Sequence, residues 1–465
     1  MRCMPVGFVR TWRWIAVVVF LHAAAITAEA ATNSISLSIA AGDHNRLNTP
    51  VCVELAVDSA LKNATWAMLS DGAGHTLVGQ VTPPSLLAAP GSAKGDTVRR
   101  ELHFILPDLK SGQTANYTAT LSEAPPSDVE HATVFRWEDT AGDHDDLLFG
   151  SRPVIRYMYQ KLDESSTDAR MATFKPYHHV FDPETGTQLL TKGAEGAHDE
   201  WPHHHGVFYG FREVTYDGGK KCDIWHCPAA FQEHAAFLST AAGPVLGRQL
   251  MEINWVAEPS KGDALNHHPA TPDAPNATFA KEKREVTVYN IPGGTLLEFA
   301  SSLNAILPPV HLDGDPQHSG FHFRANNEVM QKTKGETYFL RPDGQGPLTV
   351  HEGKGATGDE TRNWDPKSKN PDPRTINMPW DAMSVMIGGK RYTVAYLDNS
   401  HNPKPSRGSE REYGRIGNYF VADLTNEERP LDVDYRLWIQ SGEMNIPQCT
   451  ALDEDFNDPP VVTVK

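Results

Sequence analysis

The fold class is decided by the stretch Leu296-Leu-Glu-Phe-Ala-Ser-Ser-Leu303, a short apolar run that follows a glycine pair and has no helical period. Runs of the same kind recur at 153–159, 206–211, 249–255, 285–289, 392–397 and 435–439. The segments between them show almost no 3.6-residue period of the kind that marks an amphipathic helix. So many strands without alternating helices predict an all-β protein, with one large antiparallel sandwich over residues 129–465.

A smaller domain is expected ahead of this sandwich, over residues 31–128. Alternating runs at 51–57 and 100–106 are separated by Gly, Pro, Asp and Asn turns, which is typical of an immunoglobulin-like β-sandwich. The sequence Pro125-Pro-Ser-Asp128 marks the boundary. Because this part contains no catalytic constellation, we expect it to have an accessory or packing role.

The first 30 residues have the three-part layout of a secretory signal peptide. Arg2, Arg10 and Arg13 flank or precede an apolar run at 14–26, and Ala28-Glu-Ala30 offers small residues for cleavage. We therefore expect export to the periplasm or the exterior after cleavage near Ala30. No later apolar run approaches the length of about 20 residues that a membrane span requires.

The net charge limits the possible binding partners, and the cysteines limit the possible disulfides. A formal net charge of −17 repels phosphate backbones, so we expect no nucleic acid partner. Four cysteines follow the signal, Cys52, Cys222, Cys227 and Cys449, in a compartment where disulfides persist. Cys222 and Cys227 are close enough in the chain to form a disulfide, and free buried thiols are the alternative.

Histidines crowd one segment of the large domain. It contains His178, His179, His198, His203, His204, His205, His226 and His234. In an extended chain His203 and His205 would point to one face and could converge with His198, which would suffice for a zinc, copper or iron site. The same cluster could instead contact a substrate or transfer protons, with His205 as a catalytic group, or form a structural hydrogen-bond network.

A second group of polar residues lies between Asp313 and Arg324. Its second half alternates, so that Phe321 and Phe323 would share one face of a strand and His322 and Arg324 the other. Amide, imidazole and guanidinium groups suit hydroxyl or carboxylate ligands. We therefore place Gln317, His318, His322 and Arg324 in a predicted pocket, with an exposed polar face as the alternative.

A third group follows the expected strand at 392–397. Glu410 and Glu412 are candidate general bases, His401 is a candidate acid and Asn402 a candidate ligand contact, since rigid strands commonly position such loops. Exposed ion pairs are the alternative for each of them. Two long polar segments, 259–283 and 334–377, interrupt the strands, and the second contains Arg362 and Trp364, which could close over a ligand.

Several motifs in the large domain resemble the PmoA-like family, a domain of unknown function named after a methane oxygenase. They are Arg152-Pro-Val-Ile-Arg-Tyr157, Lys175-Pro-Tyr-His-His179, Leu190-Thr-Lys-Gly193, Pro202-His-His-His-Gly206, Asp223-Ile-Trp-His226, Leu312-Asp-Gly-Asp-Pro-Gln-His318, Arg362-Asn-Trp-Asp365 and Asn402-Pro-Lys404. The resemblance covers approximately residues 135–444. His205 stands where the family commonly has an arginine. Because the namesake spans a membrane several times and the present sequence has no such run, we do not expect methane oxidation.

The strand-rich layout is also similar to the galactose-mutarotase-like supersandwich, whose members use a histidine and a carboxylate on sugars. That similarity implies His318 as acid and Glu410 or Glu412 as base. We thus expect an exported carbohydrate-active protein, acting as a mutarotase, hydrolase or lyase on a carbohydrate or other small polar ligand. A non-catalytic glycan-binding or scaffold protein and a His-ligated metalloenzyme are the alternatives. The ligand contacts would come from His178, His179, His203, Gln317, His322, Arg324, Arg362, Trp364 and Asn402.

Overall fold

A computed structural model describes residues 34–91, 95–194, 201–345, 373–425 and 429–465. Strands make up 52% of the structure and helices 9%, and the strands pair antiparallel, which confirms the predicted all-β class. Residues 34–465 belong to one compact unit. None of the helices in the described ranges combines the length and the apolar character that a membrane span needs.

The N-terminal part forms a seven-stranded sheet in the order β2-β5-β4-β3-β6-β1-β28. Its strands are β1 (Ser34–Ala40), β2 (Arg46–Asp58), β3 (Trp66–Ser70), β4 (Thr76–Thr82), β5 (Thr97–Leu109), β6 (Thr114–Ser122) and β28 (Val461–Val464). Leu37, Leu69, Leu102 and Phe104 form the centre of its own apolar core. The last strand of the chain therefore completes the sheet that the first strands begin, because β28 pairs with β1.

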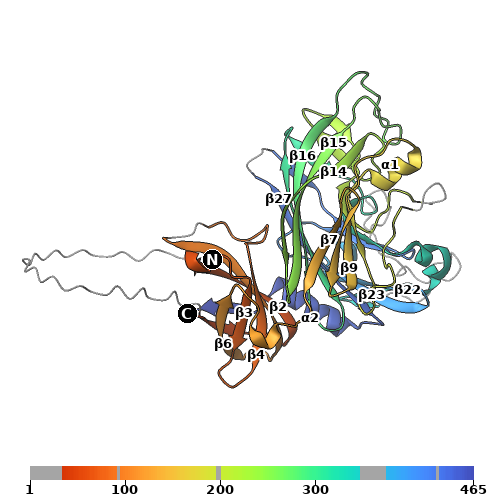
Figure 1. Cartoon of the computed structure of the whole chain (residues 1–465). Helices are drawn as coiled ribbons and strands as arrows, with labels where there is room; N and C mark the ends of the chain where they lie inside the picture. The colour runs from red at the N-terminus through yellow and green to blue at the C-terminus, as the bar shows by residue number, and fades with distance from the viewer. Residues whose placement is uncertain (1–33, 92–94, 195–200, 346–372, 426–428) are drawn as a thin grey trace, which may run out of the picture. The chain divides into compact units, whose positions relative to one another are not determined.

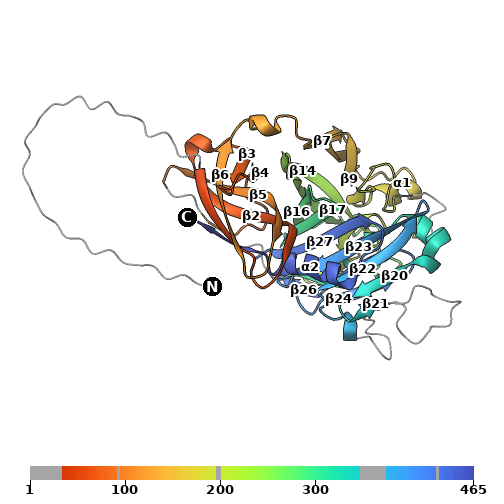
Figure 2. The same ribbon diagram turned by 90° about the horizontal axis from the view of Figure 1, so that it is seen from below.

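The largest sheet has nine strands in the order β14-β15-β16-β17-β27-β23-β22-β20-β21, and Figure 2 shows several of them in succession. They are β14 (Ala230–Ala242), β15 (Leu246–Ala257), β16 (Ala277–Tyr289), β17 (Thr295–Ala305), β20 (Tyr338–Arg341), β21 (Gly344–Gln345), β22 (Trp380–Ile387), β23 (Lys390–Asp398) and β27 (Leu431–Ser441). The decisive stretch at 296–303 is thus the interior of β17, and it pairs on both sides.

An eight-stranded sheet, ordered β24-β25-β19-β11-β10-β9-β8-β7, packs against the nine-stranded one (Figure 1). It contains β7 (Phe135–Thr140), β8 (His144–Phe149), β9 (Arg152–Met158), β10 (Tyr177–Val180), β11 (Val207–Phe211), β19 (Ser319–Arg324), β24 (Arg407–Arg411) and β25 (Arg415–Tyr419). Between the sheets Phe321 of β19 stacks on Phe299 of β17 and Tyr435 of β27, with ring centroids 4.3 and 4.8 Å apart. The large domain is therefore a two-layer sandwich.

The remaining elements are short. A four-stranded sheet contains β13 (Lys220–Cys222), β12 (Glu213–Tyr216), β18 (Val310–Asp313) and β26 (Ala422–Leu424). The two α-helices are α1 (Thr167–Thr173) and α2 (Ile446–Asn457), and single helical turns occur at Ser59–Leu61, Ser127–Val129, Val329–Thr333, Lys334–Glu336 and Pro373–Thr375. An Asn445 capping box and Pro447 in the first turn fix the start of α2.

Alternation along β19 is as the sequence predicts. Phe321 and Phe323 belong to the core between the two large sheets, whereas His322 lies on the other face, against Trp225 at a centroid distance of 4.7 Å. This outer face of the eight-stranded sheet is where the histidine-rich loops gather. The eight-stranded sheet thus supports the histidine-rich loops.

Candidate functional site

One histidine is fixed by the turn that follows β13. Asp223, which is buried, accepts hydrogen bonds on Oδ1 from the backbone N–H groups of Trp225 and His226, both at 2.8 Å. Its other oxygen, Oδ2, lies 2.8 Å from Nδ1 of His226. Because a carboxylate only accepts, Nδ1 must hold the proton, which leaves the lone pair of His226 Nε2 free.

A second histidine is fixed in the same way between β18 and β19. Asp315 Oδ1 accepts from the backbone N–H of Gln317 at 2.9 Å and lies 2.9 Å from Nδ1 of His318. The backbone N–H of His318 also donates to the carbonyl of Asp315, at 3.0 Å, and closes the turn. Both histidines therefore end an Asp-x-x-His turn, and each presents a free Nε2.

His203 lies in a turn just before β11, not in an extended strand as we predicted. The backbone N–H of His204 donates to the carbonyl of Trp201 at 3.0 Å, which folds the chain at Pro202. The predicted alternation of His203 and His205 is therefore wrong. Instead the His203 ring packs against that of His226, with centroids 4.5 Å apart, and lies 6.2 Å from that of His318.

The three imidazoles converge on one point. His203, His226 and His318 each offer a ring nitrogen, and these atoms all lie within 4.8 Å of one another. All three residues are half-buried, and the side chains of His226 and His318 remain 15% and 25% exposed. Three converging imidazoles with one accessible side are the donor set of a catalytic zinc or related divalent transition-metal site.

A frame of hydrogen bonds joins the two aspartates behind the histidines. Asn266 donates from Nδ2 to Asp223 Oδ2 at 3.0 Å. Arg212 donates to the side-chain oxygen of Asn266 at 3.4 Å and to Asp315 Oδ2 at 3.1 Å. This chain of contacts holds both carboxylates, and therefore both imidazoles, in a fixed relative position.

Burial favours the neutral form of two of the imidazoles, His318 and His203. It lowers the pKa of His318, an effect that hydrogen bonding to Asp315 partly offsets, and it lowers the pKa of His203 well below the usual value, with His226 adding to the effect. Burial raises the pKa of Asp315, but the hydrogen bonds that it accepts from His318 and from the backbone N–H of Gln317 outweigh it, so that the net shift is downward. Neutral imidazole backed by ionised carboxylate is the state that binds a metal ion.

The predicted ligand set of His198, His203 and His205 therefore changes. His205 is completely buried, and its ring packs against those of Tyr177 and Phe174, with centroid distances of 4.6 and 5.4 Å. His205 is therefore not part of the three-histidine cluster. His198 lies outside the described residues, as do Arg362 and Trp364. Of the predicted ligands, the structure places only His203 in the three-histidine cluster.

Neither of the predicted bases belongs to the group of three converging imidazoles. Glu410 is completely buried on β24 and forms a bidentate ion pair with Arg341, whose Nε is 2.6 Å from Glu410 Oε1. Glu412 is half-buried in the turn between β24 and β25, and His401 is exposed. Since its carboxylate is committed to a guanidinium, Glu410 is a structural group in this fold, not a base beside His318.

The other predicted ligand contacts support the backbone. His178 stacks on Tyr157 at 4.8 Å, and His179 Nδ1 lies 3.0 Å from the hydroxyl of Thr191. Asn402 donates to Asp398 at 2.8 Å. These three side chains are buried and positioned for packing.

The polar face of β19 lies nearer to the cluster. His322 Nε2 is 2.8 Å from the carbonyl of Ser319, and Arg324 donates to the carbonyl of Tyr413 at 2.8 Å. Gln317 precedes His318, and its carbonyl accepts from Arg415. His322 thus lies against Trp225, the residue before His226, and Gln317 is the residue before His318.

Cys222 and Cys227 are separate buried thiols in the structure, so the predicted disulfide between them is not formed. Burial raises the pKa of Cys227 to about 12 and that of Cys222 well above its usual value. Neither thiol is therefore a reactive group.

His226, Asp223 and Asp315 were not among the predicted site residues. The signal was present, because Asp223-Ile-Trp-His226 and Asp315-Pro-Gln-His318 share the same Asp-x-x-His spacing. An aspartate that caps a turn and holds an imidazole three residues later accounts for the repetition. The prediction used the spacing of the crowded histidines at 203–205. It did not use the Asp-x-x-His motif, which occurs in two separate segments.

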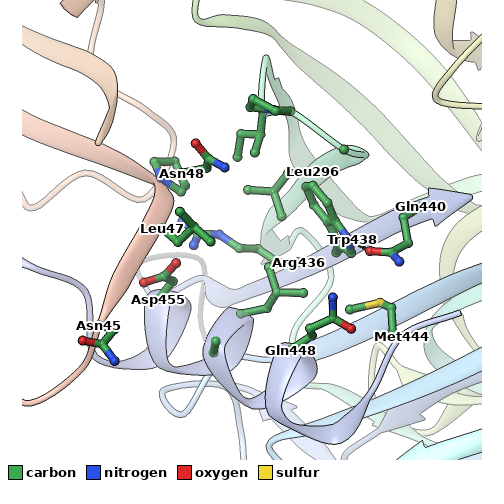
Figure 3. A pocket seen from close by; sticks show the side chains of 16 residues that line it. Asn45, Leu47, Asn48, Leu296, Arg436, Trp438, Gln440, Met444, Gln448 and Asp455 are labelled. Atoms are coloured by element: carbon green, nitrogen blue, oxygen red, sulfur yellow. Dashed lines mark hydrogen bonds between the residues drawn. The ribbon is translucent and has the colours of Figure 1, made fainter. Parts of the chain in front are cut away.

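A separate groove of about 330 Å³ lies between β2, β17, β27 and α2 (Figure 3). Leu47, Leu296 and Trp438 are among the side chains that line it, and none of the predicted site residues that the structure describes does. It offers apolar walls but no cluster of titratable groups like the one described above. The three-histidine cluster is therefore the candidate functional site.

Residues 145–452 match the sequence model of a family described as "Family of unknown function (DUF6807)". All three histidines and both aspartates of the cluster fall within the matched range. None of the curated proteins matches the chain.

Proposed function

The chain belongs to DUF6807, a family of unknown function, and from that premise we propose that it is a metal-dependent enzyme whose divalent ion is bound by His203, His226 and His318. The observation that supports this is the convergence of three imidazole nitrogens, two of them fixed by Asp-x-x-His turns. Within the described part of the chain, the Nε2 atoms of His226 and His318 form no hydrogen bond and are directed away from their aspartates.

Zinc fits this donor set best. Three nitrogen ligands would leave at least one coordination position for water or substrate, as in catalytic zinc sites. A zinc ion held by these histidines would lower the pKa of bound water to about 7 and so supply a nucleophile or base at neutral pH without a separate catalytic carboxylate. The commitment of Glu410 to Arg341 is consistent with such a mechanism.

We propose a carbohydrate as the substrate class. Trp201 and Tyr413 pack together beside the cluster with ring centroids 4.4 Å apart, and both are only half-buried. Such an aromatic surface next to a metal-bound nucleophile suits a sugar ring. The similarity to the galactose-mutarotase-like proteins also favours a carbohydrate substrate. The resemblance to the PmoA-like family does not assign a role to any residue. The layout of residues 1–30 favours export.

The metal content of the full chain tests the proposal. The protein is purified without a histidine tag, stripped with a chelator, and reloaded with zinc before elemental analysis. We expect about one zinc ion per chain, with a loss of at least tenfold in affinity for His226→Ala and for His318→Ala, because each removes one of three ligands.

His75→Ala is the matched control, since His75 also bonds an aspartate, Asp71, but its side chain is 83% exposed and lies in the loop between β3 and β4 of the N-terminal sheet. This variant should bind zinc like the unmodified protein. Binding that is equally strong in His226→Ala, or absent from the unmodified chain, would overturn the proposal. Zinc binding without turnover of any glycan would favour a sugar-binding protein over an enzyme.

A further inference from the structure

Two buried cations flank the three-histidine cluster. Lys175 is 2% exposed, and its Nζ donates to the carbonyl of Trp225 at 2.7 Å, directly before His226 in the chain. Arg415 is completely buried and donates to the carbonyl of Gln317, directly before His318. The positive charges of Lys175 and Arg415 both act on His203. Each cation is thus tied to the backbone beside a proposed metal ligand.

Within the described ranges, neither cation forms an ion pair with a carboxylate. The hydrogen bonds of Lys175 and Arg415 go to backbone carbonyls and, for Arg415 Nη2, to the hydroxyl of Ser409 at 3.3 Å. The carboxylates whose charge reaches them are Asp223 for Lys175 and Asp315 for Arg415. Both carboxylates are already bonded to the histidines, and Asp315 also pairs with Arg212.

The aromatic packing around Lys175 explains why a long side chain lies at this position. It does not explain why that side chain carries a charge. Its Nζ lies over the rings of Phe208, Phe174 and Trp225, at 4.4, 4.8 and 5.5 Å from their centroids. Contacts of this kind stabilise a buried ammonium, yet a methionine would fill the same space without desolvating a charge. Burial lowers the pKa of Lys175 to about 8, which leaves most of it protonated at neutral pH.

Hydrogen-bond donors without acceptors occur in the same neighbourhood. Within the described part of the chain, the buried Nε1 of Trp225 and Nε of Arg415 have no partner. The Trp225 ring lies 6.2 Å from that of His318 and 6.3 Å from that of His204. Buried donors that lack an acceptor are costly, and a ligand oxygen relieves that cost.

We propose that the ligand of the metal site is a small carboxylate-bearing molecule, such as a sugar acid. This inference rests on the proposed metal site. With a divalent ion bound, the positive charges of the ion, Lys175, Arg415 and Arg212 outnumber the two carboxylates, in a protein whose net charge is −17. In a buried site such an excess is weakly screened, and a ligand carboxylate neutralises it.

Cobalt-loaded full-length protein tests the inference with sodium acetate as the probe. Acetate that binds at the metal changes the visible absorption of cobalt, and titration gives its dissociation constant. We expect saturable binding of acetate, no saturable change with glycerol, and weakening of acetate binding by about tenfold or more in Lys175→Met. Lys220→Met is the matched control, because Lys220 is 59% exposed and pairs with Asp217.

Arg415 gives an independent comparison. Arg415→Gln should weaken acetate binding by about tenfold, whereas Arg415→Lys, which keeps the charge, should restore most of the affinity. Failure of cobalt to bind at the histidines would overturn the metal site itself. Normal cobalt binding with acetate affinity unchanged in Lys175→Met and Arg415→Gln would overturn only the carboxylate ligand, as would tighter binding of glycerol than of acetate.

Discussion

At the scale of single residues, the arrangement depends on two aspartates that each perform two tasks. Asp223 and Asp315 use the same side chain to close a backbone turn and to hold an imidazole by its Nδ1. The turn fixes where the ring lies, and the carboxylate fixes which nitrogen is free. A carboxylate behind the ring also makes Nε2 a stronger donor to a metal ion.

Asp223→Asn and Asp315→Asn should therefore weaken zinc binding without unfolding the protein. The amide keeps the shape and the backbone contacts but removes the negative charge behind the ring, for which we expect a loss of about 10- to 100-fold in affinity. Competition with a chelator of known affinity measures it. Asp423→Asn is the control, since Asp423 lies 2.7 Å from Nδ1 of His311 on the exposed surface. Equal effects in all three variants would contradict this role.

The residues of the site were only partly predictable. His203 and His318 were both named, His203 because histidines crowd its segment and His318 because amide and guanidinium side chains lie near it in the sequence. Their grouping with His226 was not predicted, since it depends on a turn at Pro202 and on bringing loops at 203, 226 and 318 together. Glu410 looked like a base, but the sequence does not show that Arg341, 69 residues away, neutralises it.

At the scale of secondary structure elements, the floor of the site depends on close approach between β19 and β25. Gly320 has a φ of +94°, and a Cβ there would lie 1.9 Å from the carbonyl oxygen of Asn418. A side chain at this position must push the two strands apart. Because β19 begins directly after His318, such a shift would also move that ligand.

Gly320→Ala should accordingly lower the free energy of unfolding by about 2–4 kcal/mol, through backbone strain and overpacking together. Gly218→Ala separates the two effects, since Gly218 has a φ of +73° but no atom within 4 Å of the added Cβ. Strain alone should cost that variant about 1–2 kcal/mol. Urea unfolding measures both, and equal losses would show that the close approach does not matter.

The buried pair of Arg341 on β20 and Glu410 on β24 joins the two large sheets. Arg341→Met leaves the Glu410 carboxylate buried without its cation, which should cost about 3–5 kcal/mol in the free energy of unfolding. Zinc affinity measured on the folded fraction should stay within about threefold. A large loss of zinc binding with unchanged stability would instead favour Glu410 as part of the site.

Strand positions followed from the sequence more reliably than loops did. The runs at 153–159, 206–211, 296–303 and 392–397 fall within β9, β11, β17 and β23 or overlap them closely. Apolar residues at these positions have only one way to be buried, which is between sheets. Loop conformation depends on capping groups and on neighbours distant in the chain, so the turn at His203 did not follow.

At the scale of the whole molecule, the N-terminal sheet is joined to the large domain by polar contacts. Gln80 Oε1 accepts from the backbone N–H groups of Val245 and Leu246 at 3.1 and 2.9 Å. Arg248 of β15 pairs with Glu101 of β5 at 3.0 Å, and both are buried. The accessory or packing role that we expected for the N-terminal part stays a prediction.

This interface predicts a pH dependence. Burial raises the pKa of Glu101. Hydrogen bonding to His103 and the charge of Arg248 lower this pKa by more than burial raises it, so that the net value is about 2. Because the folded pKa lies below the unfolded value, the ionised carboxylate stabilises the fold above about pH 4.5, and this stabilisation is lost as the pH falls toward 2.

Glu101→Gln should therefore be less stable than the unmodified protein by about 2–3 kcal/mol at pH 7, and the difference should shrink between pH 4.5 and 2. Thermal unfolding across that range measures it. Glu54→Gln is the control, because Glu54 pairs with Arg99 but is 49% exposed, and such pairs contribute at most about 1 kcal/mol. A difference that does not change with pH would contradict the assignment.

The central claim is that His203, His226 and His318 hold one divalent ion, and anomalous diffraction tests it most directly. Crystals of the full chain soaked in zinc are measured on both sides of the zinc absorption edge. We expect one strong anomalous peak about 2.0–2.1 Å from a ring nitrogen of each of the three histidines. A map with no peak between these imidazoles, or with zinc bound only elsewhere, would contradict the claim.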